Sequence, residues 1–257
     1  MEIAEHIDAV RHHGHHLARA AERAGLDAPV PPCAPWRVKD LLRHTGHVHR
    51  WAARHITEGA PAILDGPPEE EMLRGGPADD GLLAWFRDGH AALVGTLATA
   101  DPAVQCATFM AAPSPLAFWA RRQAHETAIH RADADSALGV TPAYEPDFAA
   151  DGIDELVMGF GRRRKYQPGS VADGGRLRML AADTGAAWLV EARDGRLQPR
   201  RETADGAPDA DCTLTGPASG LYLYLWHRTD ADQAGVTVTG DPALLASWQA
   251  SVRVRWD

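Results

Sequence analysis

The clearest chemical signal in the sequence is a glutamate and a histidine separated by one helical turn. Glu126 and His130 stand at positions i and i+4, so in a helix their side chains point the same way from adjacent turns. A carboxylate and an imidazole presented together can ligate one metal ion, as glutamate and histidine side chains do inside helical bundles. The residues alone also permit a plainer interpretation, a buried ion pair that orders the bundle.

The helix face that carries this pair changes from apolar to polar along its length. It begins with Leu116 and Trp119 and continues, at three- and four-residue steps, through Gln123 to the glutamate and the histidine. Burying a carboxylate or an imidazole costs free energy unless the group is paired or bound to a metal. We therefore expect the polar part of this face to meet a partner in the interior. Asp133, one step further on, either orients a ligand histidine or caps the helix end.

A third ligand has to come from another helix, and the segment Leu41–His49 offers three histidines. His44 continues an apolar stripe toward the interior, which makes it the preferred ligand. His47 and His49 remain competitors on geometry alone.

The dipeptide of His125 and Glu126 is not a zincin motif. That motif needs two histidines at i and i+4, whereas His125 and His130 are five positions apart and diverge by about 140° around the helix. His125 is therefore expected to face away from the pair or to act on it indirectly.

These side chains need helices to hold them, and the first 165 residues show helical spacing of apolar residues. Ser114 followed by Pro115 is a strong start for the helix that carries Glu126 and His130. Four long antiparallel helices with one extended connection predict a four-helix bundle, and a fifth, shorter helix is expected to link two domains. The expected helices span residues 3–25, 36–58, a third segment capped by Asp79 or Asp80 that runs past Leu97, residues 114–138 and, for the short fifth helix, 146–164.

The remainder of the chain turns to short strand-like runs separated by glycine and aspartate, which predict a smaller α+β domain with an antiparallel sheet. The domains are expected at residues 1–165 and 166–257. Strands are predicted at 176–182, 186–192, 210–215 and 236–239, and helices from 216 to 226 and from 242 to 248.

Composition narrows the functional classes. A formal net charge of −9 disfavours a surface that binds nucleic acid. The sequence has no run of 18 apolar residues, so it does not predict a membrane segment. Three widely spaced cysteines, Cys33, Cys106 and Cys212, predict neither a disulfide framework nor a cysteine zinc site. We expect a cytoplasmic protein, a monomer or a small homo-oligomer.

Several motifs resemble those of the mycothiol-dependent maleylpyruvate isomerase family, actinobacterial-type enzymes with a DinB-like bundle and a C-terminal domain like the sterol carrier proteins. The resemblance covers nearly the whole chain. It is carried by Trp36–His44, Ala124–Asp133, Thr213–Ser219, Leu223–Arg228 and Val238–Leu245.

The resemblance implies a zinc site made by His44, Glu126 and His130, and an arginine from the C-terminal domain, for which Arg228 is the best match. From sequence, a plain surface or sheet-end role for Arg228 is equally open. Two nitrogens and one carboxylate also suit nickel, iron or manganese, so the cofactor is written as Zn²⁺ or another divalent metal. One departure is Arg37, where the family pattern usually has a serine or threonine cap, and it leaves the start of that helix uncertain.

Three protein ligands leave one position on a metal open, and a thiol can take it as a thiolate. The resemblance implies that mycothiol, the thiol cosubstrate, adds to the cis double bond of a maleylpyruvate-like electrophile, which rotates and then eliminates the thiol. In an S-transferase the adduct would be released. Two other classes remain: a metal-dependent hydrolase or cyclase that uses no thiol, and a non-catalytic small-molecule-binding protein.

Overall fold

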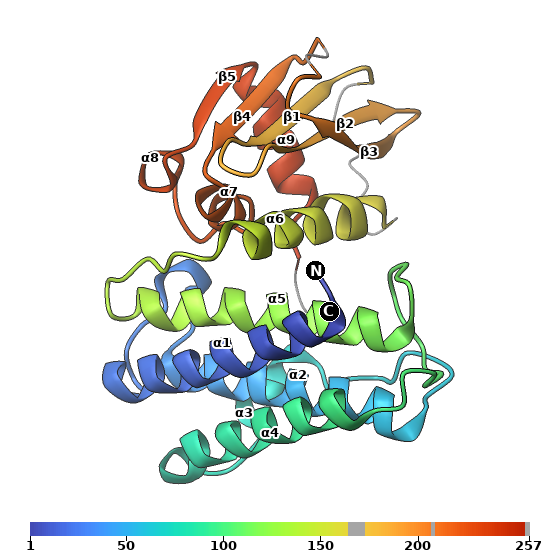
Figure 1. Cartoon of the computed structure of the whole chain (residues 1–257). Helices are drawn as coiled ribbons and strands as arrows, with labels where there is room; N and C mark the ends of the chain where they lie inside the picture. Colours follow the sequence, from blue (N-terminus) through green and yellow to red (C-terminus); the bar gives the residue numbers. More distant parts are fainter. Residues whose placement is uncertain (164–172, 207–208, 255–257) are drawn as a thin grey trace. The chain divides into compact units, whose positions relative to one another are not determined.

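The chain folds into two compact units in a computed structural model, shown in Figure 1. The structure describes residues 1–163, 173–206 and 209–254. The first unit comprises Met1–Pro142 and the second Ala143–Arg255.

The first unit is a bundle of four long helices, as the sequence predicts. Helix α1 packs along α5 and α2 packs along α4, while α1 also contacts α4 and α2 also contacts α5 (Figure 1). The helices that carry the predicted ligands, α2 and α5, are therefore neighbours. The elements are α1 (Ile3–Ala24), η1 (Pro31–Cys33), α2 (Val38–Glu58), α3 (Glu69–Arg74), α4 (Asp79–Thr99) and α5 (Pro115–Ser136). Among the described residues, no helix is both long enough and apolar enough to span a membrane.

Local caps fix the ends of these helices. The Ser114 hydroxyl accepts a hydrogen bond from the Ala117 amide at 3.1 Å, and α5 starts at the next residue, a proline. Helix α2 ends at Glu58, and the next residue, Gly59, has a positive φ of 57° that suits glycine. Neither Asp79 nor its neighbour caps α4, because Ala78 occupies the cap position and the aspartates lie in the first turn. In the first turn their negative charges stabilise the helix, because the N-terminal end of a helix carries a partial positive charge.

The bundle core is mainly apolar, but all four long helices also bury histidines in it. Leucine side chains from α1, α2 and α4 pack with Phe86, which is fully buried. Gly14 allows α1 and α4 to approach closely, because a Cβ at this position would lie 2.1 Å from Nε2 of His90. His90 itself is buried and donates from Nε2 to the Val10 carbonyl at 2.9 Å.

The second unit is α+β, with one five-stranded sheet in the order β3-β2-β1-β4-β5. The sheet is antiparallel except for β1 and β4, which run parallel. Helix α7 contacts β4, and α9 contacts both β1 and β4. The strands are β1 (Arg176–Ala181), β2 (Ala186–Arg193), β3 (Arg196–Thr203), β4 (Cys212–Gly216) and β5 (Thr237–Gly240). The helices are α6 (Pro146–Asp154), η2 (Glu155–Gly159), η3 (Phe160–Arg162), α7 (Ala218–Leu225), α8 (Ala231–Ala234) and α9 (Pro242–Ser251).

Helix α6 belongs to the second unit, although the sequence pattern assigned it to the first domain. Tyr144 and Phe148 make ring contacts with Tyr222 of α7, with centroids 5.4 and 6.2 Å apart. The carboxylate of Asp154 accepts hydrogen bonds from Trp188 of β2 and Arg201 of β3. These contacts place the division of the chain near residue 142. The predicted boundary between residues 165 and 166 lies outside the described residues.

Candidate metal centre

Helices α2 and α5 bring the three predicted ligands together inside the bundle. Oε1 of Glu126 lies 3.1 Å from Nε2 of His130 and 3.5 Å from Nε2 of His44. One ligand atom from each residue lies within 4.8 Å of those of the other two. The two imidazoles are 4% and 7% exposed, so water screens the group only weakly.

A tryptophan packs against one side of this triad, defined as His44, Glu126 and His130. Trp36, just before α2, has its ring centroid 5.0 Å from that of His44 and 6.4 Å from that of His130, the latter in a stacked arrangement. The indole orients both imidazoles and removes water from their faces.

The amide of Arg37 donates to the Asp40 carboxylate at 2.8 Å, which supplies a cap contact at the start of α2 without a serine or threonine.

Two charged residues outside the triad form hydrogen bonds with His130 and Glu126. Nδ1 of His130 donates to Oδ2 of the fully buried Asp133 at 2.8 Å, which directs Nε2 toward Glu126. Arg122 donates from Nη2 to Oε2 of Glu126 at 2.9 Å. The two oxygens of the glutamate therefore have different partners, one the imidazoles and the other a guanidinium.

Burial and charge act against each other on the pKa values of the triad. Burial favours neutral His130, but the carboxylates of Glu126 and Asp133 outweigh it and raise the histidine pKa to about 9. Burial also disfavours ionised Glu126, yet His130, His44 and Arg122 hold its pKa well below the usual range. The pKa of His44 is lowered, chiefly by burial.

The donor set fits a divalent metal ion. Two imidazole nitrogens and one carboxylate oxygen converge from two rigid helices, which is a common ligand set for zinc with one position left open. The carboxylates of Glu126 and Asp133 also favour positive charge at this place, as the raised pKa of His130 indicates. Metal binding by these residues stays a prediction.

The competing histidines have other partners. His47 lies against Trp85, with ring centroids 5.1 Å apart. Nε2 of the fully buried His49 is 3.0 Å from the Thr127 hydroxyl. His125 is buried beside His6 of α1, as its angular offset on the helix predicts.

Sequence reasoning did not identify Trp36 or Arg122 as parts of the site. The i,i+4 spacing of Arg122 and Glu126 was a usable signal for an ion pair. Trp36 was noted only as the first residue of the motif Trp36–His44, because its packing against the triad depends on the turn before α2, which spacing does not predict.

Arg228 lies in the second unit, shortly after α7. Its Nη1 donates to the backbone carbonyl of Trp226 at 2.7 Å, and its side chain is part-buried. This contact orients the guanidinium locally, and the predicted catalytic role of Arg228 stays a prediction.

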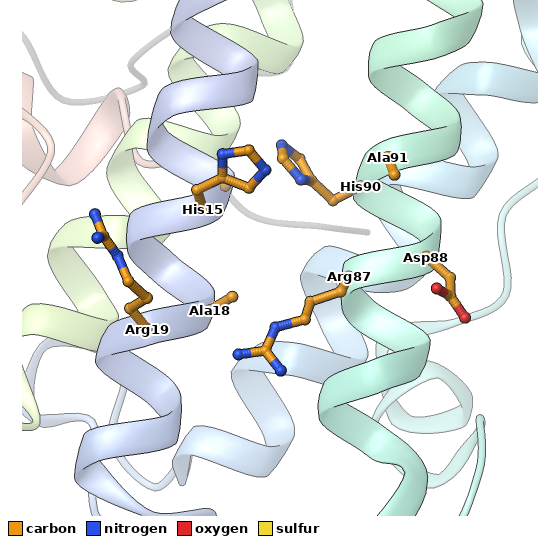
Figure 2. Close-up of a pocket in the computed structure, with 8 residues that line it drawn as sticks. His15, Ala18, Arg19, Arg87, Asp88, His90 and Ala91 are labelled. Atoms are coloured by element: carbon orange, nitrogen blue, oxygen red, sulfur yellow. The ribbon is translucent and has the colours of Figure 1, made fainter.

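A separate groove of about 540 Å³ lies between α1 and α4 (Figure 2). In Figure 2 the rings of His15 and His90 lie next to each other, and they meet edge to face with centroids 5.3 Å apart. Arg87 at the other end pairs with Glu22 at 2.8 Å. No member of the triad lines this groove.

The comparisons with known proteins cover both units. Residues 7–135 match the family model of the mycothiol maleylpyruvate isomerase N-terminal domain, and residues 147–247 match the MDMPI C-terminal domain. Two crystal structures of mycothiol-dependent maleylpyruvate isomerase, one a histidine-to-alanine mutant, share the fold. The mutant has a TM-score of 0.64 at 14% identity and the other 0.61 at 15%, each over 93% of both chains. No curated protein matches. The chain belongs to the mycothiol-dependent maleylpyruvate isomerase family.

Proposed function

We propose that this protein is a metal-dependent enzyme that activates a low-molecular-weight thiol, mycothiol, for addition to a small electrophile. The observation that carries the proposal is the buried convergence of His44, Glu126 and His130 on one point. Family membership supports a thiol-dependent isomerase, and an S-transferase would use the same first step. The metal in this proposal is zinc or another divalent ion.

Each residue around the triad has a definite task in this proposal. Nε2 of His44, Nε2 of His130 and Oε1 of Glu126 hold the ion, which when bound keeps a coordinated thiol in its thiolate form at neutral pH. Asp133 keeps the His130 ring turned toward the ion. Trp36 shields the imidazole faces from water.

Two of the three cysteines, Cys106 and Cys212, are poorly suited to act as a protein nucleophile, which supports a thiol supplied from outside. Burial raises the pKa of Cys106 and, more weakly helped by Asp241, that of Cys212. A raised thiol pKa leaves less thiolate at neutral pH, which is the opposite of what a protein nucleophile needs. Neither cysteine belongs to a described metal-ligand group.

The electrophile in this proposal is a maleylpyruvate-like molecule with a cis double bond. The thiolate sulfur bonds to one alkene carbon, and the alkene electron pair moves onto the conjugated carbonyl oxygen as an enolate. The carbon–carbon bond, now single, rotates. The enolate then re-forms the double bond as the trans isomer and expels the thiolate. Arg228 is proposed to pair with a substrate carboxylate through its planar guanidinium. The cytoplasmic location expected from the sequence stays a prediction.

The test is elemental analysis of the purified protein beside a His130→Ala variant, followed by titration of both with mycothiol while thiolate absorbance is recorded. About one metal ion per wild-type chain, lost in the variant, is expected. The thiolate signal should appear only in the wild type. His55→Ala is the matched control, because it removes a buried histidine of α2 that belongs to no described metal-ligand group.

The other outcomes identify the competing functions. Metal without a thiolate signal would favour a hydrolase or cyclase that uses no thiol. A wild-type protein that takes up no metal even when it is supplied would overturn the proposal and leave a small-molecule-binding protein.

A further inference from the structure

Arg122 is a buried cation one helical turn before the glutamate of the triad. Its residue exposure is 3%, and its Nη2 lies 2.9 Å from Oε2 of Glu126. The other carboxylate oxygen, Oε1, faces the imidazole nitrogens of His130 and His44 at 3.1 and 3.5 Å. Arg122 therefore contacts one carboxylate oxygen of Glu126, and the two histidines contact the other.

This division limits how the glutamate can bind an ion. A free carboxylate can present one or both oxygens to a metal, and it can rotate between the two arrangements. A charge-assisted hydrogen bond to a buried guanidinium is among the stronger contacts available to it. An oxygen held by Arg122 points away from the imidazoles, so only Oε1 remains directed at them.

We infer that Arg122 is a positioning residue that holds one oxygen of Glu126 and thereby presents the other alone to the metal. This keeps a position on the ion available for the thiol. The inference rests on the proposed function, because it assigns a task in the same site. Arg122 touches neither the ion nor the thiol in this scheme.

Two effects of Arg122 on metal binding have opposite signs, which makes the inference testable. As a positive charge near a dication, the guanidinium repels the metal, so its removal alone would tighten binding. As a partner that orients Glu126, it favours binding, and losing such a contact typically weakens metal affinity by about 10- to 100-fold. The direction of the change identifies which role is the larger.

The experiment measures Co²⁺ affinity by competition with a chromophoric chelator for the wild type, R122M and R122K. We expect R122M to bind about tenfold more weakly or worse. R122K keeps the charge but loses the planar fork, so its loss should be smaller. The visible Co²⁺ spectrum of R122M should also lose the strong absorption of a four-coordinate ion as both carboxylate oxygens bind.

The matched control is R131M on the same helix. Arg131 pairs with Asp135 in the same i,i+4 arrangement, with Nε and Oδ2 3.2 Å apart, and its Nη1 lies 3.2 Å from Nδ1 of His13, so these partners are outside the triad. Its affinity and spectrum should equal those of the wild type. If R122M does not fold, as judged by circular dichroism, R122Q replaces it and the same loss is expected.

Unchanged or tighter Co²⁺ binding in R122M, with an unchanged spectrum, overturns the inference while the proposed function stands. A wild-type protein that binds no Co²⁺ overturns both. The two failures are therefore distinguishable in one set of titrations.

Discussion

His130 lies between two carboxylates that hold a proton on its ring. Both ring nitrogens face acidic oxygens, Oε1 of Glu126 at 3.1 Å and Oδ2 of Asp133 at 2.8 Å. A metal ion binds the neutral imidazole, so it has to displace the proton on Nε2. His44 presents no such competition, because burial lowers its pKa. Metal binding therefore has to release one proton, the one on Nε2 of His130.

The first prediction is that apparent metal affinity rises with pH between about 6 and 8, by about tenfold per unit. The pKa of His130 is raised to about 9, so this residue is protonated throughout that range. Glu126 stays ionised there because its pKa is lowered. Competition titrations with Co²⁺ measure the slope, and calorimetry in buffers of different ionisation enthalpy counts the released proton. A flat profile without proton release would contradict the prediction.

At this scale the sequence was informative where spacing determines geometry. The spacing of Glu126 and His130 by one helical turn predicts that their side chains lie together, and in the structure they do. The choice of His44 over His47 and His49 relied on an apolar stripe, and the structure brings His44 to the pair. The packing of Trp36 against His44 and His130 could not be predicted, because no local pattern relates a residue before α2 to one on α5.

At the scale of helices and strands, the helix ends were predictable from local signals, whereas strands that depend on distant pairing partners were not. The ends of α1, α2 and α5 lie within about two residues of the expected positions, because caps and glycines act locally. Strand β3 was not predicted, since its polar sequence includes Pro199 and it becomes a strand by pairing with β2. The parallel pairing of β1 with β4 was missed for the same reason, because it joins segments far apart in the chain.

The second prediction concerns the close contact of α1 and α4. Gly14→Ala would place a Cβ 2.1 Å from Nε2 of His90, a buried ring that cannot move without losing its bond to Val10. We expect the free energy of unfolding to fall by about 1–3 kcal/mol. Urea denaturation measures the change.

The control for this prediction is Gly95→Ala, on the exposed side of α4. A Cβ there meets open space, so the substitution should stabilise the helix by up to about 1 kcal/mol. A Gly14→Ala variant as stable as the Gly95→Ala variant would show that α1 and α4 can separate at little cost.

At the scale of the whole molecule, the chain divides into two units near residue 142 rather than after the fifth helix. Composition located the change from helical to strand-like sequence, but Phe148 of α6, with Tyr144 just before the helix, packs on Tyr222 of α7. Helical periodicity does not reveal which domain a helix joins, because that depends on distant partners. All three members of the triad, with Arg122, Asp133 and Trp36, lie in the first unit.

The last prediction is that a fragment of residues 1–142 folds by itself and binds about one metal ion. The fragment keeps every residue that the structure places at the triad, together with the apolar core of the bundle. It lacks Arg228, so we expect no turnover of a carboxylate-bearing electrophile. Circular dichroism, a thermal melt and elemental analysis measure folding and loading. A folded fragment that stays metal-free while the full chain loads would mean that the second unit contributes a ligand, and the site would then have to be extended beyond the bundle.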